Sequence, residues 1–234
     1  MLILGIETSN TILSVALVED DKALIEITEI AKNNHSERLM PVIEQAFKEV
    51  GRTVNELDLI AVAEGPGSYT GIRIGVTVAK TLAWTCKIPL VGISSLEVLA
   101  RNLSTDGIIV PLFDARRQTV FAAAYDGLTY QPLIPEGHYA LENLLEKLKP
   151  LEKTIYFIGE DVAIYWEKIA DVLSIKASRV ETPNLNQPHA TTLIKGAKVK
   201  EPIQNIHTFT PNYHRLPEAL VNWMASQNET NDGQ

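Results

Sequence analysis

The chain has 234 residues, of which 45% are hydrophobic and 21% are charged, a balance that is ordinary for one large or two small globular domains. Twenty-nine acidic residues against 21 basic ones leave a formal charge of -8, which argues against electrostatic binding of nucleic acid over a broad surface. The single cysteine, Cys86, excludes an internal disulfide and a cysteine-rich metal site. Met1 leads directly into a strand pattern, and no apolar run approaches the roughly 18 residues of a membrane span, so we expect a cytoplasmic protein.

The first thirty residues predict three antiparallel strands joined by tight turns. Residues 2–6 and 13–18 are apolar runs, and residues 23–30 alternate between polar and apolar side chains. The first turn is a small polar cluster of Glu7, Thr8, Ser9 and Asn10.

Residues 36–50 change to a helical period with a wide apolar face. Gly51 supplies a stop, and Pro41 means that the helix starts near Met40 or has a strained first turn. We expect Met40 and Ile43 to face solvent. The face can serve the core alone or a core and a partner helix together.

A Gly/Pro/Ser loop then links an apolar strand at 59–63 to a helix at 76–85. Gly65 and Gly67 can adopt positive φ, and Ser68 or Thr70 can cap the helix. The free amides at such a helix start favour an anion. However, the spacing fits neither the P-loop nor the dinucleotide fingerprint, and a tight turn with packing glycines remains the alternative.

Residues 90–93 predict another buried strand, and Ser94 with Glu97 predicts a capping box for a helix that ends near Leu103. Residues 1–104 thus form an α/β unit with a mixed sheet, and residues 104–107 are a turn-forming break. The second half weakly echoes the first, because each begins with hydrophobic strands joined by a tight turn at an acidic residue. The elements expected there are strands at 108–113, 120–125 and 155–158, helices at 141–148, 162–173, 190–198 and 216–227, a loop at 184–189 and a disordered tail at 229–234.

The five histidines are scattered, with no pair at i, i+4, so we expect no metal site, and no serine-hydrolase elbow is present. The cluster from Glu7 to Asn10 resembles the first phosphate-binding hairpin of the actin, sugar kinase and Hsp70 superfamily. Asp114 occupies the corresponding turn of the second half. An ordinary β-turn, with hydroxyls bonded to their own backbone, explains both places equally well.

Several longer motifs together resemble the TsaB (YeaZ) family along essentially the whole chain, most densely over residues 1–117. The most specific is the block from Gly65 to Gly75, which this family shares with its paralogue TsaD. The motifs are Leu-Gly-Ile-Glu-Thr-Ser-Asn at 4–10, Asn-His-Ser at 34–36, Gly-Pro-Gly-Ser-Tyr-Thr-Gly-Ile-Arg-Ile-Gly at 65–75, Ala-Lys-Thr-Leu-Ala at 79–83, Ser-Ser-Leu at 94–96, Phe-Asp-Ala-Arg-Arg at 113–117 and Pro-Asn-Tyr-His-Arg at 211–215.

The resemblance implies an actin-like (ASKHA, ribonuclease H-like) α/β fold of two domains with mixed sheets. Residues 1–104 and 208–228 would form one domain and residues 105–207 a smaller, degenerate second one. It also implies a non-catalytic activator of TsaD in making threonylcarbamoyladenosine (t6A) next to the tRNA anticodon. TsaD would supply the metal and the transfer chemistry, TsaE would be an ATPase partner, and this chain would contact tRNA only indirectly.

The resemblance further places the TsaD contact, and a competing homodimer, on helices 36–50 and 71–85. ATP or ADP would bind only in the complex with partners. The interface residues it implies are His35, Arg38, Leu39, Met40, Ile43, Phe47, Tyr69, Ile72, Arg73, Val76 and Lys80. A vestigial nucleotide or phosphate site would comprise Glu7, Thr8, Ser9, Asn10, Gly65, Gly67, Ser68, Thr70 and Asp114.

Two residues depart from the family pattern, and two other functions stay open. Glu7 stands where the family often has Asp, and His214 stands where Leu is common. One alternative is an ATP-dependent phosphotransferase that uses Glu7, Thr8, Ser9 and Asp114. The other is a peptidase, although no nucleophile–base pair is visible in the sequence.

Overall fold

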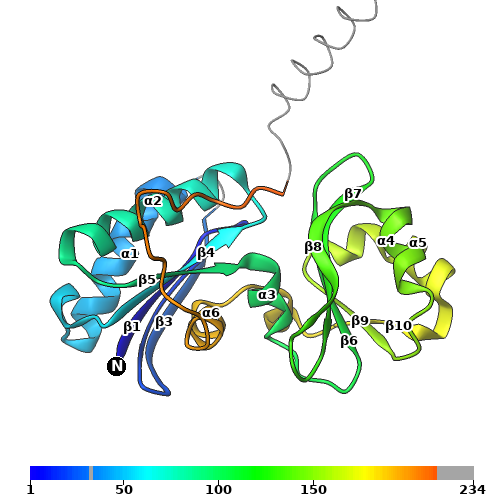
Figure 1. Cartoon of the computed structure of the whole chain (residues 1–234), viewed down its shortest axis with the longest axis horizontal. Helices are drawn as coiled ribbons and strands as arrows, with labels where there is room; N and C mark the ends of the chain where they lie inside the picture. Colours follow the sequence, from blue (N-terminus) through cyan, green and yellow to red (C-terminus); the bar gives the residue numbers. More distant parts are fainter. Residues whose placement is uncertain (32–33, 215–234) are drawn as a thin grey trace, which may run out of the picture.

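The computed structural model describes residues 1–31 and 34–214. Its first half is built on a mixed five-stranded sheet in the order β3-β2-β1-β4-β5 (Figure 1). β2 is antiparallel to both β1 and β3, so the predicted three-stranded meander is confirmed. β1 is parallel to β4 on its other side. The strands are β1 (Leu2–Glu7), β2 (Ile12–Glu19), β3 (Lys22–Ile30), β4 (Leu59–Gly65) and β5 (Leu90–Ser94).

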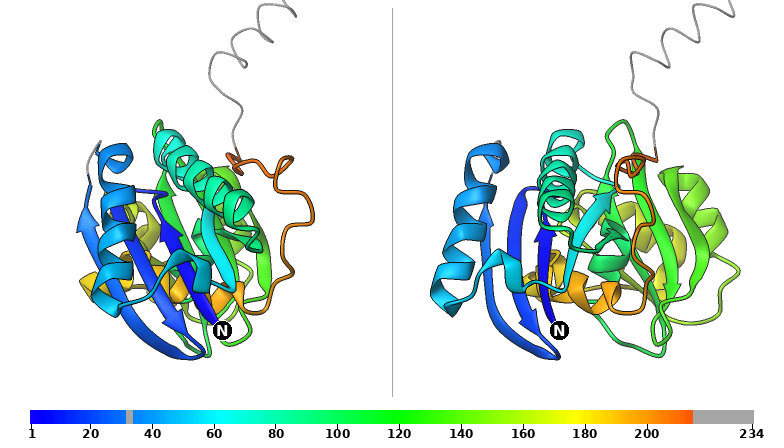
Figure 2. Two further views of the ribbon diagram at one scale, coloured as in Figure 1. Left: turned by 90° about the vertical axis from the view of Figure 1, so that its left-hand side faces the viewer. Right: turned by 60° about the vertical axis from the view of Figure 1, so that its left-hand side comes forward.

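Two long helices, α1 (His35–Val50) and α2 (Tyr69–Cys86), lie side by side on one face of this sheet (Figure 2). Their buried side chains pack on those of β1, β2 and β4 in one apolar cluster, which includes Leu39, Ile43, Ile72 and Val76. Gly51 ends α1 in the left-handed conformation, as its position predicts. A short 3-10 turn, η1 (Val54–Glu56), leads from α1 toward β4.

The opposite face of the first sheet is covered by α6 (Ala190–Ala197), with α3 (Ser95–Ala100) beside it. Leu193 and Ile194 of α6 are fully buried against Ile3 and Val91. Ser94 caps α3 by accepting hydrogen bonds from the backbone N–H groups of Leu96 and Glu97.

The second half repeats this arrangement with a sheet in the order β10-β9-β6-β7-β8. β6 is antiparallel to β7 and parallel to β9, as β1 is to β2 and β4, which confirms the weak echo in the sequence. Its strands are β6 (Ile108–Asp114), β7 (Thr119–Asp126), β8 (Pro132–Ala140), β9 (Ile155–Ile158) and β10 (Ala177–Arg179). Its helical elements are α4 (Leu141–Leu148), α5 (Val162–Leu173), η2 (Ser174–Lys176) and η3 (Pro183–Asn186).

The chain path crosses between the halves more than the expected division implies. α6 lies within residues 105–207, which that division assigns to the second domain, yet it packs on the first sheet. The physical reason is that the first sheet is apolar on both faces and needs a second layer. Residues 203–214, which we call the strap, then run back over α2. The expected helix 216–227 and tail 229–234 lie outside the described residues.

Within the described ranges, no helix combines the length and apolar character that a membrane crossing requires. Those ranges also contain no group of three or more His, Cys, Asp or Glu side chains placed to hold a metal ion.

Candidate functional site

The β1–β2 turn, the predicted phosphate hairpin of the first half, is closed to solvent. Glu7, Thr8 and Ser9 are each fully buried, and Glu7 Oε1 accepts a 2.6 Å hydrogen bond from the Ser9 N–H. Burial raises the pKa of the Glu7 carboxyl to about 7. Glu7 Oε2 and Ser9 Oγ have no hydrogen-bond partner among the described residues.

The loop before α2 closes this turn. The Ser68 N–H donates to the Ser9 carbonyl at 2.6 Å, and Thr8 Oγ1 donates to the Gly71 carbonyl at 2.8 Å. Gly67 has φ +153°, and a Cβ there would collide with the Ser9 carbonyl oxygen. Close approach of two backbones therefore explains this glycine, and the Ser68 N–H is bonded to a peptide carbonyl.

The remaining predicted phosphate residues of the first half are spread around this contact. Ser68 caps α2 by accepting from the Gly71 N–H at 3.3 Å, Thr70 is exposed, and Asn10 Oδ1 accepts from the Ile12 N–H at 2.8 Å. Gly65 is buried where the strap passes, because a Cβ there would meet the Asn212 carbonyl oxygen. A nucleotide role for this set stays a prediction.

The equivalent turn of the second half is open. Asp114, at the end of β6, is half-buried, and its Oδ1 accepts from the Arg116 N–H at 2.8 Å and from the Tyr165 hydroxyl at 2.5 Å. Asp161 Oδ2 accepts from the Asp114 N–H at 2.8 Å, and burial raises the pKa of Asp161. In the described residues no hydrogen bond joins Asp114 to Glu7, so the two acids sit in separate environments.

Several residues of the predicted helix interface belong to the core of this chain. The expectation that Ile43 faces solvent is wrong, because Ile43 is only 4% exposed. Four others are also buried, namely His35, Leu39, Ile72 and Val76. His35 Nε2 lies 3.4 Å from the Ile12 carbonyl oxygen. These residues shape the helix pair from beneath and do not form its outer surface.

Other predicted interface residues do reach the surface. Met40 is 47% exposed and Tyr69 is 46% exposed, while Phe47 is half-buried. Arg38 is exposed and forms a bidentate ion pair with Glu29 of β3, with both N···O distances at 2.8 Å.

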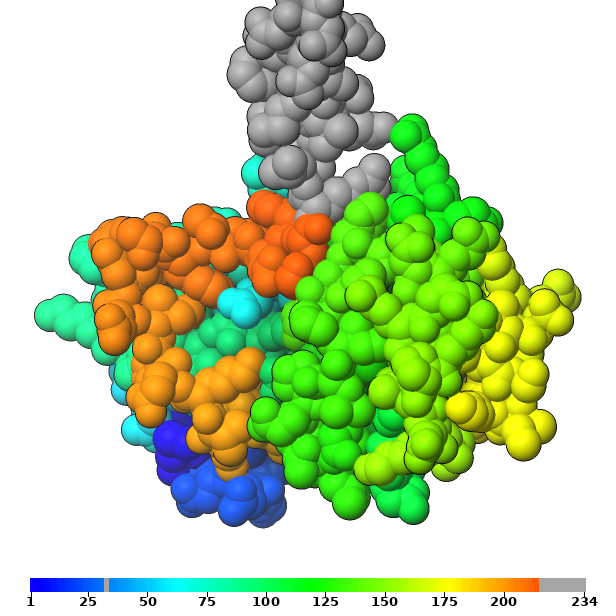
Figure 3. All heavy atoms as spheres, turned by 45° about the vertical axis from the view of Figure 1, so that its right-hand side comes forward, coloured from blue at the N-terminus to red at the C-terminus, as the bar shows by residue number. Residues whose placement is uncertain are grey.

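The strap occupies one flank of α2 (Figure 3). Lys80 Nζ donates to the strap carbonyls of His207 and Phe209, at 3.2 and 2.6 Å. The Trp84 and His207 rings meet edge to face at 4.2 Å between centroids. Lys80 thus anchors this segment.

Three further α2 side chains were missed as surface candidates. Ile74, Val78 and Leu82 are half-buried apolar residues that pack at the margin of the core cluster, together with Phe47 and Val50 of α1. Their i, i+4 spacing was readable in the sequence. Together these side chains leave a row of partly exposed apolar residues along the pair of helices α1 and α2.

The histidines do not form a hydrolytic pair. His138 Nε2 lies 2.7 Å from Thr119 Oγ1, but this hydroxyl donates its proton to the Arg116 carbonyl at 2.7 Å. The imidazole is therefore the donor to Thr119, which is not the geometry of an activated nucleophile.

Comparison with known proteins shows which family this chain resembles. The family model described as TsaD, tRNA N6-adenosine threonylcarbamoyltransferase, matches residues 27–223. The tRNA threonylcarbamoyladenosine biosynthesis protein TsaB of Bacillus subtilis (strain 168) is 41% identical over 231 residues, covering 97% of this chain and 100% of that protein.

Solved structures agree on the fold. YeaZ from Pseudomonas aeruginosa superposes with a TM-score of 0.76 at 23% identity, over 91% of this chain and 99% of that one. The ROK hexokinase from Thermus thermophilus gives 0.52 at 12% identity, over 85% and 99%. The predicted actin-like, two-sheet α/β fold is thereby confirmed. The chain belongs to the TsaB family of tRNA threonylcarbamoyladenosine biosynthesis proteins.

Proposed function

We propose that this chain acts in tRNA threonylcarbamoyladenosine biosynthesis as a non-catalytic partner that activates the TsaD transferase. The observation that carries this proposal is the closed β1–β2 turn on a chain of the TsaB family. Glu7, Thr8 and Ser9, the side chains that a phosphotransferase of this fold would turn toward nucleotide, are all 0% exposed beneath the α2 loop. The phosphotransferase alternative therefore lacks an accessible first hairpin in this chain.

The surface proposed for TsaD is the outer face of α1 and α2. It consists of the exposed Met40 and the half-buried Phe47, Ile74, Val78 and Leu82. Incompletely buried apolar side chains on two adjacent helices fit a helical partner surface. In isolation the same face would support a homodimer. TsaE would join as an ATPase, with ATP or ADP bound only in that assembly.

The test is affinity for purified TsaD. Met40→Asp should weaken binding at least tenfold, because it places a charge in an apolar contact. Ile164→Asp is the matched control, since Ile164 is 61% exposed on α5 in the other half. Thermal unfolding of both variants must match that of the parent chain.

Equal binding by Met40→Asp and Ile164→Asp would overturn the interface. The function itself would be overturned by an unchanged t6A content in the tRNA of cells that lack this chain, measured by mass spectrometry of nucleosides.

A further inference from the structure

The β6–β7 turn holds its backbone in an uncommon conformation. Three consecutive residues, Arg116, Arg117 and Gln118, have φ of 65°, 51° and 60°. The left-handed region disfavours L-residues, and glycine is the usual occupant. The chain instead places two exposed arginines and a glutamine there. Such a backbone persists only where its surroundings fix it.

Several hydrogen bonds fix this one. Asp114 Oδ1 accepts from the Arg116 N–H, and the Arg116 carbonyl accepts from both the N–H and the hydroxyl of Thr119, at 2.9 and 2.7 Å. The Gln118 carbonyl accepts from the Leu141 N–H at 3.1 Å. Tyr165 holds Asp114 in turn. The two arginines therefore extend from a backbone whose position is set in advance.

A second cationic cluster, which combines arginine with aromatic rings, lies at the start of α2. The Arg73 guanidinium lies 4.0 Å from the Tyr69 ring centroid, and its Nε donates to the Tyr213 hydroxyl at 2.7 Å. The Tyr69 and Tyr213 centroids are 4.9 Å apart. Tyr69 remains 46% exposed despite these two contacts, so part of its surface is accessible to a ligand.

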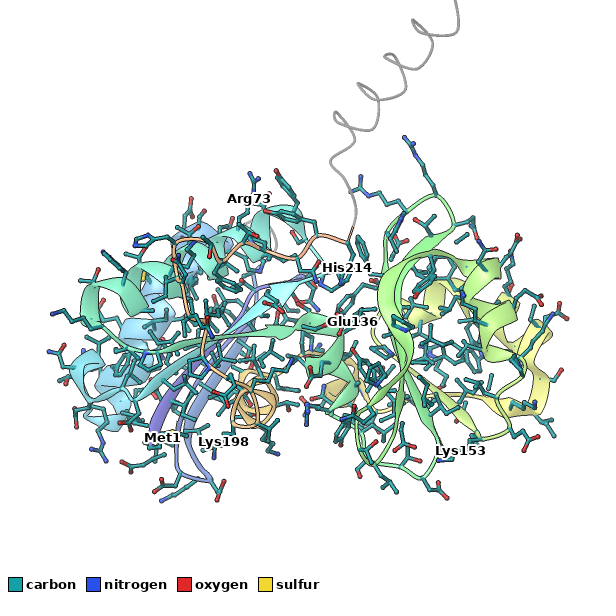
Figure 4. All side chains as sticks on the ribbon, viewed as in Figure 1. Met1, Arg73, Glu136, Lys153, Lys198 and His214 are labelled. Atoms are coloured by element: carbon teal, nitrogen blue, oxygen red, sulfur yellow. The ribbon has the colours of Figure 1, made fainter. Side chains whose placement is uncertain are left out.

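Both clusters lie on the same edge of the molecule. The β4–α2 loop, the end of the strap and the β6–β7 turn all lie at the top in Figures 1 and 2, and Figure 4 shows Arg73 on that edge. His214 Nε2 lies 3.4 Å from Glu136 Oε2, which ties the strap to β8. Ala140 lies four residues beyond Glu136 on β8, which at 3.3 Å per residue is roughly 13 Å along the strand. Ala140 pairs with Thr119 at the β6–β7 turn.

We propose that this edge binds single-stranded RNA. The arginines of the β6–β7 turn contact phosphates, and Tyr69 and Tyr213 stack against bases. Grooves that combine cationic and aromatic side chains bind single strands of roughly 4 to 16 nucleotides. An acidic protein would use the arginines but not the aromatic faces, so the combination favours RNA. The contact is local, in keeping with a net charge of -8.

This inference rests on the proposed function, because the anticodon loop is then the single-stranded segment within reach. It replaces the expectation that this chain meets tRNA only indirectly. Ser68 and Thr70, exposed beside Tyr69, add hydroxyl donors to the same edge.

Fluorescence anisotropy with a labelled anticodon stem–loop RNA tests the proposal on the full chain, alone and in complex with TsaD. Arg116→Glu should weaken binding at least about fivefold and lower the slope of affinity against salt by about one. Lys22→Glu, a matched charge reversal at the opposite edge where β3 begins, should leave affinity within about twofold. Tyr69→Ala should weaken binding to the loop but not to a blunt duplex of the same stem.

Equal affinities for Arg116→Glu, Lys22→Glu and the parent chain would overturn the proposal. So would a loss of TsaD binding by Arg116→Glu with RNA affinity unchanged, which would make this edge a protein-binding surface. Failure here is separable from failure of the proposed function. If only the RNA proposal fails, Met40→Asp still weakens TsaD binding at least tenfold and t6A still depends on the chain. If the proposed function fails, neither result is seen.

Discussion

The two halves of the molecule have the same strand order but opposite first turns. In the first half the acid at the end of β1 is buried beneath the α2 loop. In the second half the acid at the end of β6 is half-buried and organises an exposed, basic turn. The first turn of one half is thus buried in a contact within the chain, whereas the first turn of the other half lies at the surface. The difference lies in the segments that come after β4 and β9, since only the first half continues into a loop that covers its turn.

The largest loss of stability should come from a change that separates the β1–β2 turn from the loop before α2. Gly67→Ala brings a Cβ against the Ser9 carbonyl at a positive φ, and we expect a loss of roughly 3–4 kcal/mol in unfolding free energy measured in urea.

Gly51→Ala is the control for backbone conformation alone. Gly51 has φ +65° with nothing within 4 Å of an added Cβ, so we expect a loss of about 1 kcal/mol. Equal losses at both glycines would show that the contact with Ser9 carries no particular strain.

The buried acid should make stability depend on pH. The pKa of Glu7 is raised from 4.5 to about 7, so the folded state favours the neutral form, and its contribution is complete below pH 4.5 and lost as pH rises through 7. The Glu7→Gln variant should not lose stability in this way as the pH rises, because its amide side chain does not titrate.

Relative to the parent chain, Glu7→Gln should therefore gain roughly 3 kcal/mol of unfolding free energy between pH 4.5 and pH 8. Urea unfolding at several pH values measures it. A difference between the two proteins that stays constant with pH would contradict the closed environment assigned to Glu7.

The open turn should depend on its supporting hydrogen bonds. Tyr165→Phe removes the hydroxyl that donates to Asp114, and we expect a loss of about 1.5 kcal/mol together with faster hydrogen exchange at the Arg116 amide. Tyr139→Phe, which removes an exposed hydroxyl bonded to the Pro135 carbonyl, should cost less and leave that amide unchanged.

The smallest effect should come from the strained backbone itself. Gln118→Gly relieves a left-handed residue, and we expect a gain of about 0.5 kcal/mol in thermal or urea unfolding. Ser104→Gly, at an exposed position outside that conformation, should instead reduce stability. A loss in Gln118→Gly would mean that the left-handed turn carries no strain.

Local features of this fold could be predicted from the sequence. The apolar runs at 2–6 and 13–18 and the alternation at 23–30 predicted the meander. Ser68, one of the two expected capping residues, caps α2. Both features depend on neighbours in the chain. β8 was missed because prolines and Gly137 interrupt its pattern and it lies at a sheet edge. β10 has only three residues, too few for a period.

Long-range packing could not be predicted. The helix at 190–198 was expected, but its docking on the first sheet depends on residues such as Ile3 and Val91, far away in sequence. The wide apolar face of α1 likewise did not reveal that Ile43 points inward while Met40 points out. In the candidate site, the motifs identified the family, but only the structure shows that Glu7 is enclosed and Arg116 is presented.

The position of α6 determines when the first sheet can be covered during synthesis. The inner apolar face of the first sheet, formed early in synthesis, stays uncovered until residues 190–197 emerge, because that helix is its second layer. Ala190 and Thr191 are then held by side chains of β2 and β3, through Ser14 and Glu26. The nascent chain therefore carries an uncovered apolar sheet face through most of translation, and we expect the first half alone to be an aggregation-prone expression fragment.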